Sequence, residues 1–263
     1  MRMRQRTATR TITPITTLRA TTTFIATTTL TSIGMDADAL IILLQFSDGL
    51  FPAGGYAHSL GLETYVQAGA VSDAAGVESF IRAYLENSAG PTDAVAAIAA
   101  ARAAAAGDLP ACLELDASLE AMKCAAELRE ASRQMGRQTL RIAAAVCGSA
   151  IVEELSAALE SGRTPGHHAV AFGLIASAQG WDAQATASAL LYATSAQLVG
   201  AALRLAPLGQ LAGQRILWNL RPIIARLAAV AANRKPDEIW SFVPAIEIAA
   251  MQHAHLSARL FRS

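Results

Sequence analysis

Residues 72–87 read SDAAGVESFIRAYLEN, and this stretch decides the fold class because its apolar side chains repeat with the period of an α-helix. They recur at spacings of three and four residues: Val77, Phe80, Ile81, Tyr84 and Leu85. Such spacing places them on one helical face, which other parts of the chain must cover. Ser72 or Asp73 can cap the start of this helix by accepting a hydrogen bond from a free backbone N–H group.

Similar patterns follow one another in both directions from this helix. Gly90 and Pro91 are expected to end it, because proline lacks a backbone N–H and disrupts a continuing helix. Further helices are expected at 93–107, 109–136 (one helix or two), 137–159, 168–179, 182–205, 208–232 with a bend near Pro222, and 245–256. No alternation of strand and helix interrupts the series. The sequence therefore predicts an all-α fold, a single compact multi-helix bundle over residues 35–263.

The amino-acid composition agrees with a helical fold. Hydrophobic residues make up 53% of the chain but aromatic residues only 5%, so alanine and leucine must supply much of the apolar fraction. Both are strong helix formers, and alanine also lets neighbouring helices approach closely. A chain of 263 residues is long enough to bury one large core, so a second domain is not required.

Residues 1–34 differ from the rest of the chain. They are rich in threonine, contain five arginines and no acidic residue, and show no helical pattern, so we expect them to be disordered. Organellar transit peptides share this bias, but the threonine blocks form no amphipathic face. We favour the interpretation that Met35 is the true initiator. From Met35 onward, 16 basic and 21 acidic residues remain, and this acidic body argues against nucleic acid as a partner.

The cysteines and the apolar runs bear on where the protein works. Cys112, Cys124 and Cys147 are few, odd in number and far apart, which suits a reducing compartment in which each thiol is a small core side chain. The longest apolar runs, such as 94–106, are shorter than the roughly 18 residues that a membrane span needs. We therefore expect a cytoplasmic protein that does not bind membranes.

The most unusual local sequence is the loop 48–63, DGLFPAGGYAHSLGLE. No lysine follows Gly55, so it is not a phosphate-binding loop, which needs an ammonium group to reach the phosphates. A hydrolase would use Ser59 as its nucleophile on a tight turn after a buried strand at residues 40–46. One flanking glycine of that motif is replaced by Ala57, and no repeated strand and helix units follow, which argues against this reading.

The residues of this loop also allow a purely structural interpretation. Pro52 and the glycine pair 54–55 would break the chain between two helices, with Ser59 near the start of the second. In that case His58 and Glu63 would be groups on the helix surface.

The histidines are not spaced to share a metal ion from one helix. His253 and His255 are two positions apart, which is about 200 degrees around a helix, and His167 and His168 are adjacent. Ligands on a helix are more commonly three or four residues apart. We predict no metal site within the chain and no cofactor.

Residues 133–141, RQMGRQTLR, gather three arginines around Gly136. They form either a solvated helix face, or a surface on which the guanidinium groups meet the carboxylates of a partner while Gly136 permits a close helix contact. The residues alone favour the first interpretation.

Four stretches carry a set of motifs in one order and spacing. The first has the pattern F-P-x-G-x-[FY]-x-x-S-x-G-L-E and is matched by Phe51, Pro52, Gly54, Tyr56, Ser59, Gly61, Leu62 and Glu63. The second is Met135, Gly136, Arg137 and Gln138. The third is His168, Val170, Phe172 and Gly173, followed by Gln197 and by Pro207, Leu208, Gly209 and Gln210. The fourth is Ala249, Ala250, Met251, Gln252 and His253, then Arg259, Leu260, Phe261, Arg262 and Ser263. Together they resemble the UreF family of urease accessory proteins, except that Ala254 stands where the family has a glutamate.

This resemblance implies an all-α, non-catalytic adaptor that is usually a homodimer. Family members bind the accessory protein UreD, called UreH in some organisms, and the GTPase UreG, whose activity they modulate. The assembly delivers nickel to apo-urease. Two other classes stay open: a generic helical module for protein interaction, and a serine hydrolase that uses Ser59.

On this resemblance we expect three segments to bind partners. The tail 259–263 is expected to be loose, and to bind the UreD-type partner together with the preceding helix, with Phe261 filling a pocket. The loop and the arginine-rich face are expected to meet either a second copy or the GTPase. The residues concerned are Phe51, Pro52, Gly54, Tyr56, Ser59, Glu63, Arg133, Gly136, Arg137, Gln138, His253, Arg259, Leu260, Phe261 and Arg262.

Overall fold

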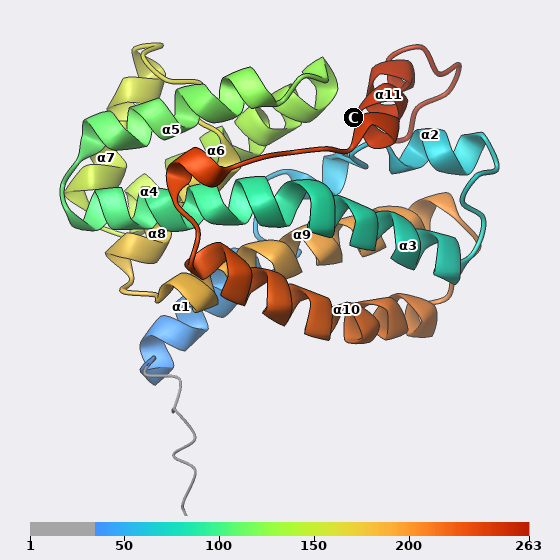
Figure 1. Cartoon of the computed structure of the whole chain (residues 1–263), viewed down its shortest axis with the longest axis horizontal. Helices are drawn as coiled ribbons and strands as arrows, with labels where there is room; N and C mark the ends of the chain where they lie inside the picture. Colours follow the sequence, from blue (N-terminus) through green and yellow to red (C-terminus); the bar gives the residue numbers. More distant parts are fainter. Residues whose placement is uncertain (1–34, 263) are drawn as a thin grey trace, which may run out of the picture. The chain divides into compact units, whose positions relative to one another are not determined.

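The computed structural model describes residues 35–262, which form helices and connecting loops with no strand among them (Figure 1). The expectations for residues 1–34 fall outside this described part. In chain order the elements are α1 (Ala37–Ser47), η1 (Gly55–Ala57), α2 (Leu62–Gln67), α3 (Ala74–Tyr84), η2 (Leu85–Ala94), α4 (Val95–Ala105), α5 (Leu109–Met122), α6 (Ala126–Val146), α7 (Ala150–Glu160), α8 (His168–Ala178), α9 (Ala183–Leu205), α10 (Gln210–Ala232), η3 (Pro236–Glu238) and α11 (Pro244–His253). The predicted all-α class is confirmed.

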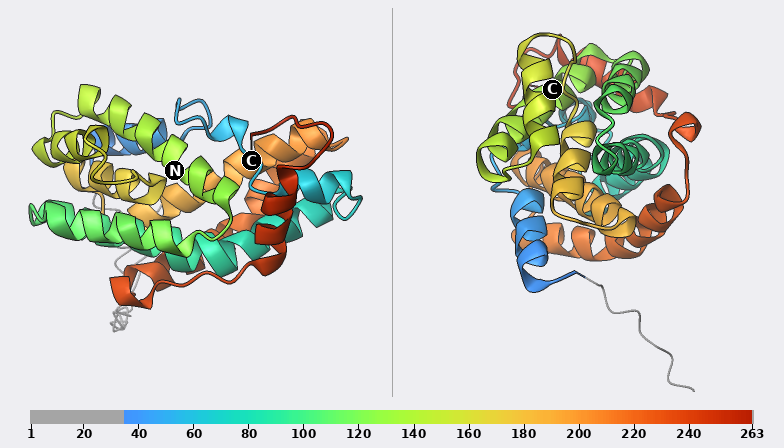
Figure 2. Two further views of the ribbon diagram at one scale, coloured as in Figure 1. Left: turned by 90° about the horizontal axis from the view of Figure 1, so that it is seen from above. Right: turned by 90° about the vertical axis from the view of Figure 1, so that its left-hand side faces the viewer.

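Helix α4 lies at the centre of the bundle, where other helices surround it (Figure 2). Its residues from Val95 to Ala100 are all buried, and most of them are alanine. Helix α8 packs directly on it at Gly173, where an added Cβ would come within 2.3 Å of the Ala97 carbonyl oxygen. The expectation that small residues allow close helix packing is therefore confirmed at this crossing.

Helix α9 joins two hydrophobic clusters. Leu191 and Leu198 pack with α3 and α10 in the first cluster, and Leu190 packs with α4 to α8 in the second. This helix is the one element among residues 35–262 that is long and apolar enough to cross a membrane, but 56% of its most apolar window is buried inside the fold. That degree of burial is typical of the core helix of a globular bundle.

The prediction that Gly90 and Pro91 end a helix is wrong. Elements α3, η2 and α4 form one continuous helix, in which η2 is a wider π-helical segment (Figure 1). The wider turn accommodates the proline ring. Gly90 is needed there because an added Cβ would lie 2.7 Å from the Leu85 carbonyl oxygen.

The connector between α10 and α11 supplies the hydrogen bonds that this irregular segment lacks. The backbone N–H of Phe242 donates to the Asn87 carbonyl at 2.8 Å, and that of Trp240 donates to the Pro91 carbonyl at 3.4 Å. The Thr92 hydroxyl donates to the Trp240 carbonyl. Buried backbone polar groups need such partners, so the connector completes the central helix.

The predicted helix boundary at Gly136 is also wrong, because α6 runs through it and ends near Cys147, and α7 begins after Gly148. Gly136 is buried against the turn before α8, where its missing side chain makes room for the Gly166 carbonyl. The expectation that all three cysteines are core side chains is confirmed only for Cys112, which is buried. Cys147 is half-buried and Cys124 is exposed.

We predict that Gly136→Ala strongly destabilises the protein, whereas Gly200→Ala does not. A Cβ at position 136 would lie 2.0 Å from the Gly166 carbonyl oxygen, while a Cβ at position 200 meets nothing within 4 Å. Overpacking costs about 1–3 kcal/mol or more, and alanine in an open helix position gains up to about 1 kcal/mol over glycine. Urea unfolding followed by circular dichroism measures both. Equal free energies of unfolding for the two variants would contradict this account.

Candidate partner-binding site

The loop between α1 and α2 follows a fixed path that glycines make possible. Gly54 and Gly61 have φ angles of 86° and 89°, in the left-handed region that side chains disfavour. Gly61 also packs against α11, where a Cβ would meet the Ile246 carbonyl oxygen at 3.1 Å. The loop is therefore shaped by its own backbone and by contact with the last helix.

Two side chains of α9 donate hydrogen bonds to backbone carbonyl groups of the loop. The amide of Gln197 donates to the His58 carbonyl at 3.2 Å, and the guanidinium of Arg204 donates to the Tyr56 carbonyl at 2.6 Å. The Arg204 guanidinium also stacks over the Phe261 ring, 4.3 Å from its centre. Arg204 thus connects the loop to the C-terminal strap, which we define as residues 258–262.

The C-terminal strap is anchored on one buried carboxylate, that of Glu63 at the start of α2. The backbone N–H groups of Leu260 and Phe261 donate to its two oxygens at 2.7 and 3.1 Å. Gln67, one turn further along α2, donates to the Ala258 carbonyl at 2.8 Å. The backbone N–H of Arg262 donates to the Ala57 carbonyl at 2.8 Å, which returns the strap to the loop.

His253, at the end of α11, lies between two carboxylates. Its Nε2 is 2.8 Å from Glu63 and its Nδ1 is 2.9 Å from Glu127, and its side chain is fully buried. Each ring nitrogen of His253 therefore faces a carboxylate oxygen, and the ring links α2 to α6. Arg259 of the strap lies 3.7 Å from Glu127. Residues of α2, α6, α11 and the strap meet in this cluster.

The hydrogen bonds around Glu63 determine its ionisation. Burial alone would raise the pKa of this carboxyl, but hydrogen bonds from Leu260, His253 and Phe261 outweigh burial and hold the pKa below its usual range. The carboxylate therefore stays charged near neutral pH and keeps the strap in place.

Three expectations about this region are wrong. Glu63 and His58 are buried rather than on a helix surface, because α2 begins only at Leu62 and the loop folds inward before it. Burial lowers the pKa of His58 to about 4, helped by the nearby charge of Arg262, so this ring is neutral near pH 7. The strap is not a loose tail. Phe261 was expected to fill a pocket on a partner, but it is buried within its own chain.

The residues that were predicted to bind partners divide into buried, half-buried and exposed groups. Ser59, Glu63, Gly136, His253 and Phe261 are buried and act on the fold. Phe51, Gly54 and Arg133 are half-buried. The exposed members, which a partner can reach, are Pro52, Tyr56, Arg137, Gln138, Arg259, Leu260 and Arg262.

The hydrolase interpretation fails on two counts. Ser59 has no exposed surface, and residues 40–46, its supposed strand, belong to the helix α1. The Ser59 hydroxyl instead accepts a hydrogen bond from the Glu63 backbone N–H at 3.4 Å, as a residue ahead of a helix does.

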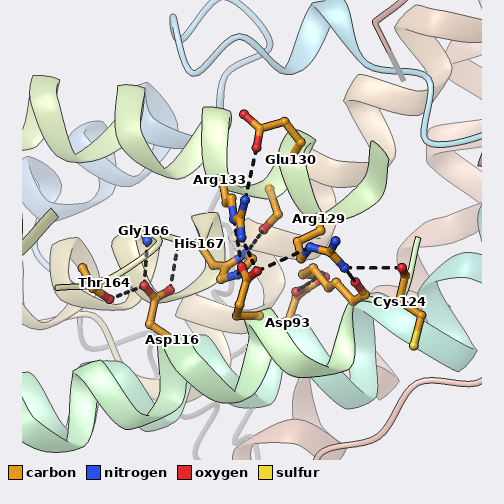
Figure 3. Close-up of polar contacts among 12 residues, drawn as sticks. Asp93, Asp116, Cys124, Arg129, Glu130, Arg133, Thr164, Gly166 and His167 are labelled. Carbon is orange, nitrogen blue, oxygen red and sulfur yellow. Dashed lines mark hydrogen bonds and ion pairs between the residues drawn. The ribbon is translucent and has the colours of Figure 1, made fainter. Parts of the chain in front are cut away.

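The arginine-rich face of α6 meets a second polar network, centred on Glu120 of α5. Arg133 binds the Glu120 carboxylate through two nitrogens and lies 3.5 Å from Glu130. Figure 3 shows the contact between Arg133 and Glu130. His167 lies 3.1 Å from the same carboxylate through Nε2, while its Nδ1 is 3.0 Å from the Ser132 hydroxyl. Burial lowers the pKa of His167, which favours a neutral ring that accepts from Ser132 and donates to Glu120. Arg133 is thus already paired with carboxylates of its own chain.

A cavity of about 260 Å³ lies under the loop, bordered by Phe51, Tyr56, His168 and Gln197. Burial lowers the pKa of His168 to about 4, so its ring is neutral near pH 7. Among residues 35–262, no group of three or more His, Cys, Asp or Glu side chains is placed to hold a metal ion.

The polar clusters of residues 35–262 hold backbone segments together, and the one proposed nucleophile is inaccessible. These features define an all-helical protein whose buried polar clusters fix its own backbone. A sequence model of the UreF family matches residues 71–221 of the chain. The chain belongs to the UreF family of urease accessory proteins, whose members take part in urease maturation.

Individual relatives match most of the chain. The urease accessory protein UreF of Trichodesmium erythraeum is 34% identical over 229 residues, which cover 87% of this chain and 99% of the relative. That of Paenarthrobacter aurescens is also 34% identical, over 87% of this chain and all of the relative. That of Xanthobacter autotrophicus is 36% identical over 233 residues, which are 88% of this chain and 95% of the relative.

We predict that Glu63→Gln frees the C-terminal strap. A glutamine offers one acceptor oxygen where the carboxylate offers two, so its NH₂ group would face backbone or imidazole donors. Losing hydrogen bonds to a charged group costs about 1.5–3 kcal/mol, so amide exchange at Leu260 and Phe261 should speed up by about tenfold or more. Hydrogen exchange read by NMR measures this. Glu78→Gln, which removes an ion pair on α3, is the control and should leave these two amides unchanged.

The low pKa of Glu63 predicts that its contribution to the free energy of unfolding depends on pH. The pKa of Glu63 is lower in the folded protein than in the unfolded chain. Its contribution to the free energy of unfolding is therefore fully present above the unfolded pKa of about 4.3, and it is lost as the pH falls through the folded pKa. The difference in free energy of unfolding between the wild type and Glu63→Gln should therefore shrink as pH falls from 6 towards 3.5. A difference that stays constant over that range would contradict the assignment.

Proposed function

We propose that this protein is an adaptor in urease maturation that bridges a UreD/UreH-type protein and the UreG GTPase, so that nickel reaches apo-urease. Membership of the UreF family supports the maturation role, and the resemblance described above supplies the partners. In this proposal the protein is cytoplasmic, works as a homodimer, and contributes binding surfaces rather than catalytic groups.

The observation that carries the proposal is the set of exposed apolar and basic side chains on α11 and the strap. Ile248 and Met251 of α11 and Leu260 of the strap are exposed, although all three are large and apolar. The exposed Arg259 and Arg262 flank Leu260. Methionine and arginine are enriched in protein interfaces, whose centres are more apolar than the rest of the surface. We assign this surface to the UreD-type partner.

The loop supplies a second candidate surface. Tyr56 is 68% exposed at its tip, and its backbone is held by Arg204. Tyrosine on a rigid support loses little conformational freedom on binding, which favours a role in recognition. We assign the loop, together with the exposed Arg137 and Gln138 of α6, to either the second copy or the GTPase.

The first test is co-expression of the full chain with the UreD-type and UreG-type proteins of the same source, followed by size exclusion and a urease activation assay. A complex that co-elutes and is required for activation supports the adaptor. If well-folded protein binds neither partner, the adaptor proposal is wrong, and a generic helical interaction module becomes the better description.

A single substitution tests the assigned surface more sharply than removal of residues 259–263, which would also remove the buried Phe261. We predict that Leu260→Glu reduces co-purification with the UreD-type protein by about tenfold or more, because it puts a charge into an apolar contact. Leu211→Glu on α10 is the matched control, since Leu211 is 65% and Leu260 is 61% exposed. Equal retention of the partner by both variants would refute the assignment.

A further inference from the structure

An open groove of about 710 Å³ lies between α6 and the turn that follows α7. Four arginines border it: Arg133, Arg137, Arg141 and Arg163. Two carboxylates, those of Glu120 and Glu160, and the apolar side chains of Leu159 and Pro165 complete the lining. The groove is therefore a predominantly positive surface with apolar portions.

The arginines are arranged with a regular spacing on a rigid frame. Arg133, Arg137 and Arg141 follow one another at intervals of four residues on α6, so successive side chains start about 6 Å apart along one face. Arg163 stands on the opposite wall. That wall is fixed because Asp116 accepts hydrogen bonds from the Thr164 hydroxyl and from two backbone N–H groups, as Figure 3 shows.

Three of these four guanidinium groups lack an acidic partner among residues 35–262. Arg133 is bound to Glu120, whereas no hydrogen bond or ion pair joins Arg137 to another group of residues 35–262. Within the same described residues, Arg141 donates to the amide oxygen of Gln138 and Arg163 donates to the Ser161 hydroxyl, each through Nε. Their terminal N–H groups remain available. Most other arginines of this acidic body are engaged with carboxylates, carbonyls or rings, so the groove concentrates unbalanced positive charge.

We propose that this groove binds an acidic peptide segment of a partner protein, whose carboxylates pair with Arg137, Arg141 and Arg163. Carboxylates four residues apart on a helix repeat at about 6 Å, and those two apart on an extended chain at about 6.6 Å, which matches the arginine spacing. Glu120 and Glu160 disfavour a compact polyphosphate in the same space, and Leu159 and Pro165 suit apolar side chains of a peptide. The inference rests on the proposed function only in naming a partner protein.

The test is fluorescence anisotropy of the full chain with a fluorescein-labelled peptide of six Glu-Ala repeats at low salt. The double variant Arg137→Gln/Arg141→Gln should weaken binding about tenfold or more, because two charge-assisted pairs are lost. The control double variant Arg215→Gln/Arg221→Gln removes two arginines of α10 that also lack acidic partners, and should change binding less than about twofold. The arginines of residues 1–34 are common to all variants and cancel in the comparison.

The inference is overturned by equal weakening by the two double variants, by equal binding of a peptide of six Gln-Ala repeats, or by no binding at all. Displacement of the peptide by inorganic pyrophosphate at a far lower concentration than by unlabelled peptide would mean a phosphate site, which also overturns it. Circular dichroism confirms that the variants fold. Each of these failures leaves the adaptor proposal standing, because that proposal is tested separately by co-elution and urease activation.

Discussion

The buried carboxylate of Glu63 is the constraint on which the C-terminal half of the site depends. A charged carboxylate removed from water is costly unless donors surround it, and here the donors come from the imidazole of His253 and from the backbone of the strap. The side chain of Glu63 can therefore be buried only when α11 and the strap are in place. The loop depends on the same arrangement, because Gly61 packs on α11 and Ala57 pairs with Arg262.

Because of this arrangement, the strap is ordered before any partner binds. A tail that folds on contact with a partner gives up conformational entropy at that moment, which lowers its affinity. The strap of this protein is already ordered by Glu63, Arg204 and Gln67, so Leu260 and Arg262 are presented from a rigid frame. The loop is held in the same way, and both surfaces are thus preorganised for binding.

Periodicity predicted the fold class and several helices well, but local signals failed where distant groups intervene. The helices α8 and α9 begin and end within a residue or two of the predicted limits, since their apolar patterns and the cap Asp182 are local features. Pro91 was expected to end a helix, and nothing nearby in the sequence reveals that a connector about 150 residues later satisfies the carbonyls around it. Likewise, Glu63 and His253 are 190 residues apart, so their pairing has no local signal. Arg204, which stabilises both the loop and the strap, belongs to no motif and was missed.

The hydrogen bonds between η2 and the connector also constrain the order in which the chain can fold during synthesis. Ser88 pairs with Ser241, 153 residues later, so the irregular middle of the central helix lacks these partners until nearly the whole chain has left the ribosome. Contacts of such long sequence separation form late and slowly. The irregular middle of this helix therefore acquires these hydrogen bonds only after residues 240–242 have been synthesised.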